Sequence, residues 1–303
     1  MNLSVKPLPA ARSYATLSII AAVLTIGLKF GAYFLTGSVG LLSDAFESIV
    51  NLVAALAAFW ALSYAAKPPD AEHTFGHAKA EYFSSALEGV LILIAAISIA
   101  VAAVERLVHP QPIEQIGLGL GLALVAAAIN GGVAWILLQA SHRLRSITLK
   151  ADAHHLLTDV WTSVGVVIGI GLVSVTGWNV LDPIVAILVA ANIIWAGVKM
   201  LQETGAGLLD TAIPAAERRE ILSIMSEYEG IGIRFHAMRT RVSGAYRFVS
   251  FHVLVPGVWT VQRGHDLCES IEQAIEQALP GTDVTTHLEP AEDPISWDDI
   301  NLS

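Results

Sequence analysis

Long apolar stretches alternate with short polar connections over the first two thirds of the chain. They cover about residues 14–36, 39–64, 82–108, 114–140, 147–176 and 182–201. Each stretch is long enough to cross roughly 30 Å of hydrocarbon as an α-helix, and a helix satisfies its backbone hydrogen bonds within the lipid. The pattern therefore predicts six transmembrane helices.

From residue 208 onwards the pattern becomes that of a small water-soluble domain. Helical spacing over 214–228 is followed by two strands at 233–242 and 245–255, a helix at 261–279 and a last strand at 282–290. This αββαβ order predicts a ferredoxin-like α+β domain, with an open antiparallel sheet and helices on one face. We expect a transmembrane domain at 1–207, a cytosolic domain at 208–290, and a loose acidic tail at 291–303.

Composition supports this division. The chain is 54% hydrophobic, and only 15% of its residues are charged. Residues 1–202 hold 11 acidic and 10 basic residues, whereas residues 203–303 hold 16 acidic and 7 basic ones. An acidic soluble domain disfavours nucleic acid as a partner and favours cations. The single cysteine, Cys268, excludes an internal disulfide and a cysteine-rich metal site.

Basic residues predict the orientation of the helices. They gather in the N-terminal segment, in the connection between the second and third helices, and in the connection between the fourth and fifth. The opposite side has only Arg106. Because cytoplasmic connections carry the excess of lysine and arginine, both termini are expected in the cytoplasm. The expected location of this multi-pass protein is the inner (plasma) membrane.

Two of the predicted helices carry the same polar pattern. "DAFESIVN" (44–51) places Glu47 four residues before Asn51, and "DAHHLLTD" (152–159) places His155 four residues before Asp159. Residues four apart share one face of a helix. Two such faces opposite each other would supply two carboxylates, an imidazole and an amide oxygen, a workable tetrahedral set for Zn²⁺ or a similar ion.

Polar residues in membrane helices also serve simply to bind helices together. Two carboxylates among four such residues favour an ion site, because charge within the membrane is costly and usually functional. Asp44 and Asp152 lie three residues before Glu47 and His155. They either line the route to the site or hydrogen-bond its ligands.

These motifs resemble the cation diffusion facilitator family, in its bacterial zinc and ferrous-iron efflux branch. The resemblance covers nearly the whole chain and rests on "GSVGLLSDAFESIVNL" (37–52), "HTFGHAKAE" (73–81), "LKADAHHLLTDV" (149–160) and "LLDTAIP" (208–214). It implies a homodimeric exporter of divalent metal in exchange for protons, with a cytosolic metal-sensing domain.

The resemblance also implies three metal sites. Glu47, Asn51, His155 and Asp159 occupy the family's transport site, but the family usually has Asp or His at the first position and Asp at the second. Asp70, His73 and His77 match a second site in a cytoplasmic loop, as an access relay or a structural site. A third, binuclear site at the dimer interface is implied for the cytosolic histidines and one carboxylate: His236, His252, His265, His287 and Glu289.

Some charges have other expected roles. Lys79 and Asp210 match an ion pair that the family uses between its membrane and soluble parts. Lys29 lies inside the first apolar stretch, and we expect its long side chain to reach the membrane interface. Glu88, six residues into the third stretch, is expected to face a cytoplasmic cavity.

Other functions remain open at this stage. An intramembrane metalloenzyme is disfavoured because His-Glu-x-x-His is absent, and the lack of Gly-x-x-x-x-Gly-Lys-Ser/Thr disfavours ATP drive. A membrane metal sensor or scaffold that does not transport is the main alternative. Ligands without sulfur suit zinc, iron, cobalt, cadmium and manganese, and we favour zinc.

Overall fold

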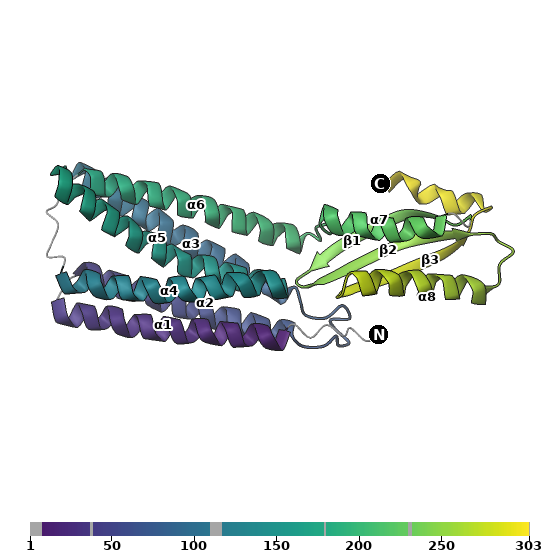
Figure 1. Cartoon of the computed structure of the whole chain (residues 1–303), viewed down its shortest axis with the longest axis horizontal. Helices are drawn as coiled ribbons and strands as arrows, with labels where there is room; N and C mark the ends of the chain where they lie inside the picture. Colours follow the sequence, from purple (N-terminus) through teal and green to yellow (C-terminus); the bar gives the residue numbers. More distant parts are fainter. Residues whose placement is uncertain (1–7, 37–38, 110–116, 179, 230–231, 303) are drawn as a thin grey trace. The chain divides into compact units, whose positions relative to one another are not determined.

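The computed structural model describes residues 8–36, 39–109, 117–178, 180–229 and 232–302. The chain divides into two compact units, one formed by residues 7–205 and the other mainly by residues 206–303. Figure 1 shows the helices of the first unit and the mixed helices and strands of the second.

Six long helices make up the first unit. They are α1 (Leu8–Thr36), α2 (Val39–Ala65), α3 (Ala80–Val108), α4 (Gly117–Leu144), α5 (Ile147–Thr176) and α6 (Leu181–Leu208). They confirm the predicted helical architecture. Among the described residues, five of them contain spans long and apolar enough to cross a membrane. The sixth, α5, has 30 residues and carries the polar residues of the second repeated motif.

The six helices pack around two small apolar clusters. One joins α1, α2, α4 and α5 and is rich in alanine, including Ala15, Ala134 and Ala153. The other joins α3, α5 and α6 through residues such as Ile92 and Ile193. Small residues let helix backbones approach closely, which is how membrane helices gain packing energy when lipid is as apolar as their side chains. The first half of α5 contributes to both clusters, whereas Trp161, Ile168 and Val175 further along the helix are exposed.

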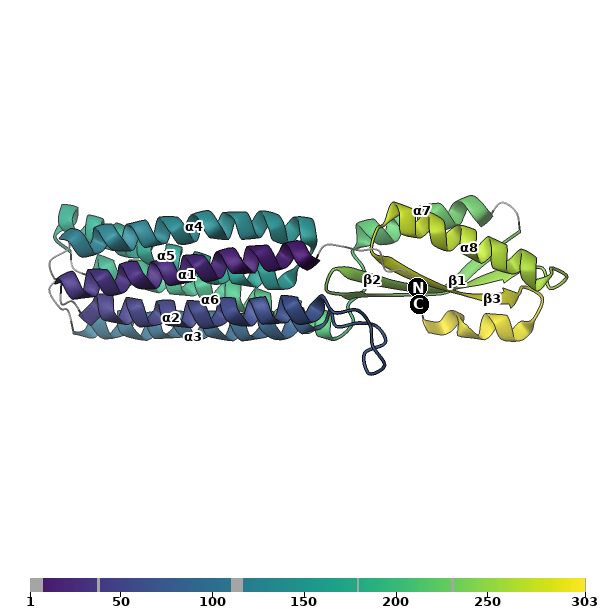
Figure 2. The same cartoon turned by 90° about the horizontal axis from the view of Figure 1, so that it is seen from below.

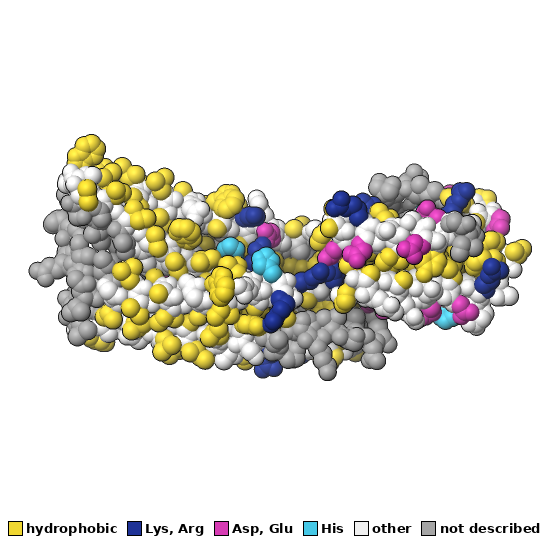
Figure 3. Space-filling model, in the orientation of Figure 1, with side chains coloured by type: hydrophobic (Ala, Val, Ile, Leu, Met, Phe, Trp, Pro, Cys, Tyr) yellow, Lys and Arg dark blue, Asp and Glu magenta, His cyan; other side chains and the backbone are white. Residues whose placement is uncertain are grey.

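Large apolar side chains point outwards from this bundle. Leu24, Trp60, Ile94, Trp135 and Leu188 are all between 54% and 66% exposed. Figure 3 shows apolar side chains over the visible face of the helical unit, whereas acidic side chains are frequent on the other unit. A water-soluble bundle would expose polar side chains instead, so this surface is suited to lipid.

The ends of α5 are fixed by local interactions. Ser146 caps its N-terminus by accepting a hydrogen bond from the backbone of Leu149, and Gly177 ends it in the left-handed conformation at φ 73°. The buried carboxylate of Glu81, at the start of α3, accepts hydrogen bonds from the Ser146 hydroxyl and, at 3.3 Å, from the Thr148 backbone. A carboxylate is favoured beside the positive end of a helix dipole, so this contact fastens α5 to α3.

The second unit has the predicted order of elements. It contains α7 (Ala215–Glu229), β1 (Arg234–Ser243), β2 (Tyr246–Val255), α8 (Val261–Ala278) and β3 (Thr282–Pro290). The sheet order is β1-β2-β3, with β1 antiparallel to β2. The predicted fully antiparallel sheet is wrong, because β3 runs parallel to β2. The intervening α8 is a crossover helix, and such a connection returns the chain in its original direction.

The two faces of this sheet differ. Val249, Phe251 and Val253 alternate along β2 towards a core that they share with Ile271 and Ile275 of α8. Both α7 and α8 cover this face, as predicted, and a 3₁₀ helix, η1 (Pro294–Leu302), lies on the opposite face (Figure 2). The expected loose tail at 291–303 is therefore wrong for Pro294–Leu302. Its Trp297 donates a hydrogen bond from Nε1 to the Ala291 carbonyl, 3.0 Å away.

Candidate metal sites

Side chains from α2 and α5 meet inside the helical unit. The Asn51 Oδ1 atom lies 2.7 Å from His155 Nε2, and Asn51 donates from Nδ2 to Asp159 Oδ2 at 2.6 Å. All three side chains are buried, with exposed fractions of 3–5%. Glu47 and Asp44 lie on α2, but their side chains are outside the described part of the chain. Three of the four predicted ligands are thus brought together.

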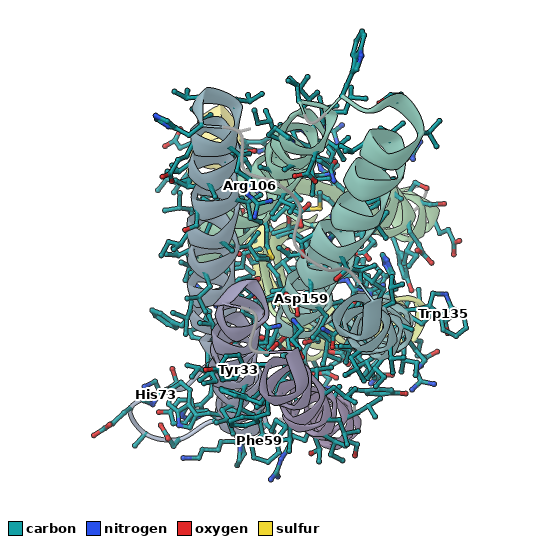
Figure 4. The ribbon with its side chains drawn as sticks, turned by 90° about the vertical axis from the view of Figure 1, so that its left-hand side faces the viewer. Tyr33, Phe59, His73, Arg106, Trp135 and Asp159 are labelled. Carbon is teal, nitrogen blue, oxygen red and sulfur yellow. The ribbon has the colours of Figure 1, made fainter. Side chains whose placement is uncertain are left out.

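Asp159 is surrounded by hydrogen-bond donors. Besides Asn51, its Oδ2 atom accepts hydrogen bonds from Asn130 Nδ2 of α4 at 2.9 Å and from Lys29 Nζ of α1 at 3.3 Å. Figure 4 shows Asp159 within the bundle, whereas Trp135 of α4 lies at its periphery. Removing one partner from a buried ion pair of this kind typically costs about 3–5 kcal/mol.

Lys29 does not reach the membrane interface. Only 3% of it is exposed, and its ammonium group pairs with the buried Asp159 carboxylate. The snorkelling expected from the sequence is therefore wrong. The Asp159 carboxylate neutralises the Lys29 charge inside the bundle, so the lysine side chain does not need to extend to the interface. Sequence reasoning also missed Asn130, whose only signal was that it is a lone polar residue in a long apolar stretch.

The hydrogen bonds of Asn51 indicate that Nε2 of His155 carries a proton. Because Asn51 donates to Asp159, its oxygen is left to accept, and His155 therefore donates from Nε2. Among the side chains that the structure describes, none hydrogen-bonds the buried Nδ1 atom of His155. In the neutral imidazole this nitrogen holds the lone pair that a metal ion requires.

Two further acidic residues are buried in the helical unit: Glu88, near the start of α3, and Asp152 of α5. Ser18 of α1 donates to Asp152 Oδ1 at 2.9 Å, and Ser84 donates to Glu88 Oε1 at 3.1 Å. Both carboxyl groups are almost wholly buried. Asp152 thus bonds to α1. Glu88 is inside the bundle at 0% exposure, not beside an open cavity as the sequence suggested.

The connection between α2 and α3 contains a compact donor cluster. His73 Nδ1 and His77 Nε2 each lie 3.2 Å from an Asp70 carboxylate oxygen, and the donor atoms of the three residues lie within 4.8 Å of one another. A hydrogen bond from the His73 backbone is the main cause that lowers the pKa of Asp70. Two imidazoles and a carboxylate form a common three-ligand set for zinc, so the donor chemistry fits a metal ion.

The strands of the second unit align three histidines in one row. His236 on β1 pairs directly with His252 on β2, which in turn pairs with His287 on β3. Glu289 lies 2.9 Å from His236, 3.3 Å from His252 and 3.5 Å from His287. The donor atoms of His236, His252 and Glu289 lie within 4.8 Å of one another.

This row is on the face of the sheet that η1 covers. Trp297 stacks on the His236 ring at a centroid distance of 6.1 Å. The buried Nδ1 of His236 has no hydrogen-bond partner within the described part of the chain, and the donor set again fits a divalent metal. His265 does not join the cluster, because it is on α8, which covers the other face of the sheet (Figure 2).

The predicted pair between the two units involves Lys79 and Asp210. Lys79 immediately precedes α3, and Asp210 follows α6. Within its own unit, the Asp210 carboxylate lies 3.5 Å from the guanidinium of Arg241. The pairing of Lys79 with Asp210 stays a prediction.

Comparisons with known proteins agree with these features. Residues 15–209 match the model of the cation efflux transmembrane domain, and residues 213–291 match that of the cation efflux protein cytoplasmic domain, a dimerisation type. An uncharacterized transporter of Synechocystis sp., sll1263, is 59% identical over 95% of this chain and 93% of its own. The cation-efflux pump FieF of Salmonella choleraesuis is 31% identical over 96% of this chain and 95% of its own.

A solved structure of CzrB in a Zn form is 34% identical and covers 27% of this chain and 93% of its own, with a TM-score of 0.26. The two family domains together extend over nearly the full sequence. The transmembrane domain contains the apolar helices and the buried polar cluster, and the cytoplasmic domain contains the row of histidines. The chain is therefore an integral membrane protein that belongs to the cation efflux family, the cation diffusion facilitators, whose members transport metal cations.

Proposed function

We propose that this protein exports divalent metal ions across the inner membrane in exchange for protons, by alternating access around one intramembrane site. The observation that carries the proposal is the buried contact between Asn51, His155 and Asp159. Ionisable side chains this deep in a membrane bundle are costly and usually functional. Glu47, one turn before Asn51 on α2, is the proposed fourth ligand.

Zinc is the favoured substrate. Glu47 and Asp159 would supply two negative charges, which balance a divalent cation, while His155 and Asn51 would add neutral donors. Such mixed nitrogen and oxygen ligands suit zinc but also accept iron, cobalt, cadmium and manganese. Protons are the proposed counter-substrate, because the imidazole of histidine ordinarily has a pKa of about 6.5 and exchanges protons near neutral pH.

The other two clusters have separate proposed roles. Asp70, His73 and His77 would hold a metal on the cytoplasmic side, as an access relay or a structural site. His236, His252, His287 and Glu289 would bind metal in the cytosolic domain and sense its concentration, and His265, away from this cluster, is retained as a further candidate ligand. We propose a homodimer with both termini in the cytoplasm, surrounded by membrane lipid.

A membrane metal sensor that does not transport is the second candidate. It is favoured by the three donors around Asp159 Oδ2, which give this carboxylate a stable set of partners without any ion. Such a protein would bind metal and change the conformation of its cytosolic domain without moving the ion across the membrane.

Flux in proteoliposomes separates these two functions. Purified protein is reconstituted with a pH gradient, and the accumulation of zinc, iron, cobalt, cadmium and manganese is measured inside the vesicles. The proposal predicts accumulation of zinc that collapses when a proton ionophore removes the gradient. Binding of zinc to the vesicles without accumulation would support the sensor.

A further inference from the structure

Lys29 brings a positive charge into the place proposed for the metal. It lies well inside α1, is 3% exposed, and places its Nζ atom 3.3 Å from Asp159 Oδ2. A divalent metal ion and a lysine ammonium group are both cations that would bind the Asp159 carboxylate. In this structure the ammonium group of Lys29 is bound to it.

The hydrogen bonds of Asp159 show which partners would compete with a metal ion. Its Oδ2 atom accepts from Lys29, Asn51 and Asn130, so a metal ion that binds this oxygen must displace at least one of these donors. Asn51 can meet the metal by turning its amide so that its oxygen points inwards. Lys29 has only donors and carries the same sign of charge as the metal, so it cannot become a ligand.

We propose that Lys29 is a tethered counter-cation, which neutralises Asp159 in the metal-free site and must leave that carboxylate each time a metal ion binds. It is thus a positioning residue that weakens metal binding and promotes release, by returning to Asp159 as the metal departs. This inference rests on the proposed function, since it takes Asp159 to be a transport ligand.

The charges explain why such a device suits this chain. Glu47 and Asp159 together balance a divalent ion, and a lysine left beside them would add an unbalanced positive charge at low dielectric. Without metal, the ammonium group of Lys29 lowers the combined charge of Glu47 and Asp159 from two negative charges to one. A tethered cation therefore limits the charge in the membrane in the metal-free state, which the bundle must pass through in every transport cycle.

The test compares zinc affinity at this one site. Equilibrium zinc binding is measured on the full chain in detergent, and the transport-site portion is taken as the binding that Asp159→Asn abolishes. Lys29→Met keeps the length of the side chain and removes its charge. We expect it to tighten this portion at least tenfold, while Lys29→Arg stays within about threefold of the native protein. In proteoliposomes, Lys29→Met should lower both the KM and the maximal rate.

Two results would overturn the inference. An unchanged or weaker zinc affinity in Lys29→Met means that the lysine does not compete with metal. A lower unfolding temperature with unchanged affinity means that it serves stability alone. If Lys29→Met does not fold, Lys29→Gln carries the same expectations. If Asp159→Asn removes no zinc binding, the proposed transport site fails; if it does and Lys29→Met has no effect, only the role of Lys29 fails.

Discussion

The side-chain oxygen of Asn51 lies 2.7 Å from Nε2 of His155, so that α2 and α5 meet through a neutral amide inside the bundle. The same amide donates to Asp159 at 2.6 Å. At this position the related family pattern usually has a carboxylate. The amide can bind a metal through its oxygen, but it cannot take up a proton when the metal leaves.

Asn51→Asp is therefore expected to raise the number of protons returned per metal ion. The new carboxylate adds one titratable group beside Asp159 without changing the size of the side chain. The ratio is measured in proteoliposomes from zinc flux against set pH gradients. Asn51→Ser, which adds no titratable group, should keep the native ratio even if it slows transport. Equal ratios for the aspartate variant and the native protein would contradict the expectation.

His236→Ala should weaken metal binding by the cytosolic cluster at least tenfold. It removes one of the three donors that the sheet brings within 4.8 Å of one another. Zinc titration of the full chain tests this in an Asp159→Asn background, which removes the proposed transport site. His142→Ala is the matched control, since His142 is exposed in the last turn of α4. A loss of the same size in both variants would show that the cluster is not the binding site.

Gly264→Ala should destabilise the cytosolic unit, because overpacking by the added methyl group costs about 1–3 kcal/mol. The higher helix propensity of alanine offsets up to about 1 kcal/mol of this cost. A Cβ at this position of α8 would lie 2.2 Å from Cδ2 of Leu288 on β3. The apparent unfolding temperature in detergent is the measurement. In a Leu288→Ala background, which removes the obstructing atoms, the same change should be neutral or stabilising. Equal losses in both backgrounds would exclude the steric explanation.

Glu276→Gln should raise stability slightly at neutral pH. Burial is the main cause that raises the pKa of Glu276, and the nearby Asp283, Glu272 and Glu269 raise it further. A carboxyl group whose pKa is raised by folding destabilises the fold when ionised, and this penalty disappears as the pH falls through that pKa. Because this burial is only partial and solvent screens the exposed carboxylate, the gain should be about a few tenths of a kcal/mol.

The stability difference between Glu276→Gln and the native protein should be present at pH 7 and vanish near pH 4. It should also shrink as salt is added, because surface repulsion is screened. Glu220→Gln on the exposed surface of α7 provides a control with the same change of charge. A gain that persists at pH 4 would point to a cause other than ionisation.

The architecture followed from the sequence because its periodicities are strong. Apolar runs of 20 residues or more located the membrane helices, and alternation along residues 246–255 located β2. The direction of β3 was missed because its own residues carry no sign of which way it pairs; the helix between β2 and β3 decides it. The helix at residues 294–302 was missed because its Trp297 stacks on His236. This is a tertiary contact, which local sequence patterns do not reveal.

The polar cluster was predicted only from the two helices that share a motif. Asn51, His155 and Asp159 were found because spacing by four residues puts side chains on one face. Lys29 and Asn130 belong to α1 and α4, and no local pattern says which helices will be neighbours of α5. Packing of small residues brings those helices together and turns two isolated polar residues into partners of Asp159.

The central claim is that Asp159 binds the transported metal. Its most direct test is zinc accumulation in proteoliposomes under a pH gradient, compared between the native protein and Asp159→Asn. We predict that the native protein accumulates zinc and that the variant, folded as a six-helix protein with its cytosolic zinc binding intact, loses at least nine tenths of the initial rate. Accumulation by the folded variant at the native rate would contradict the account.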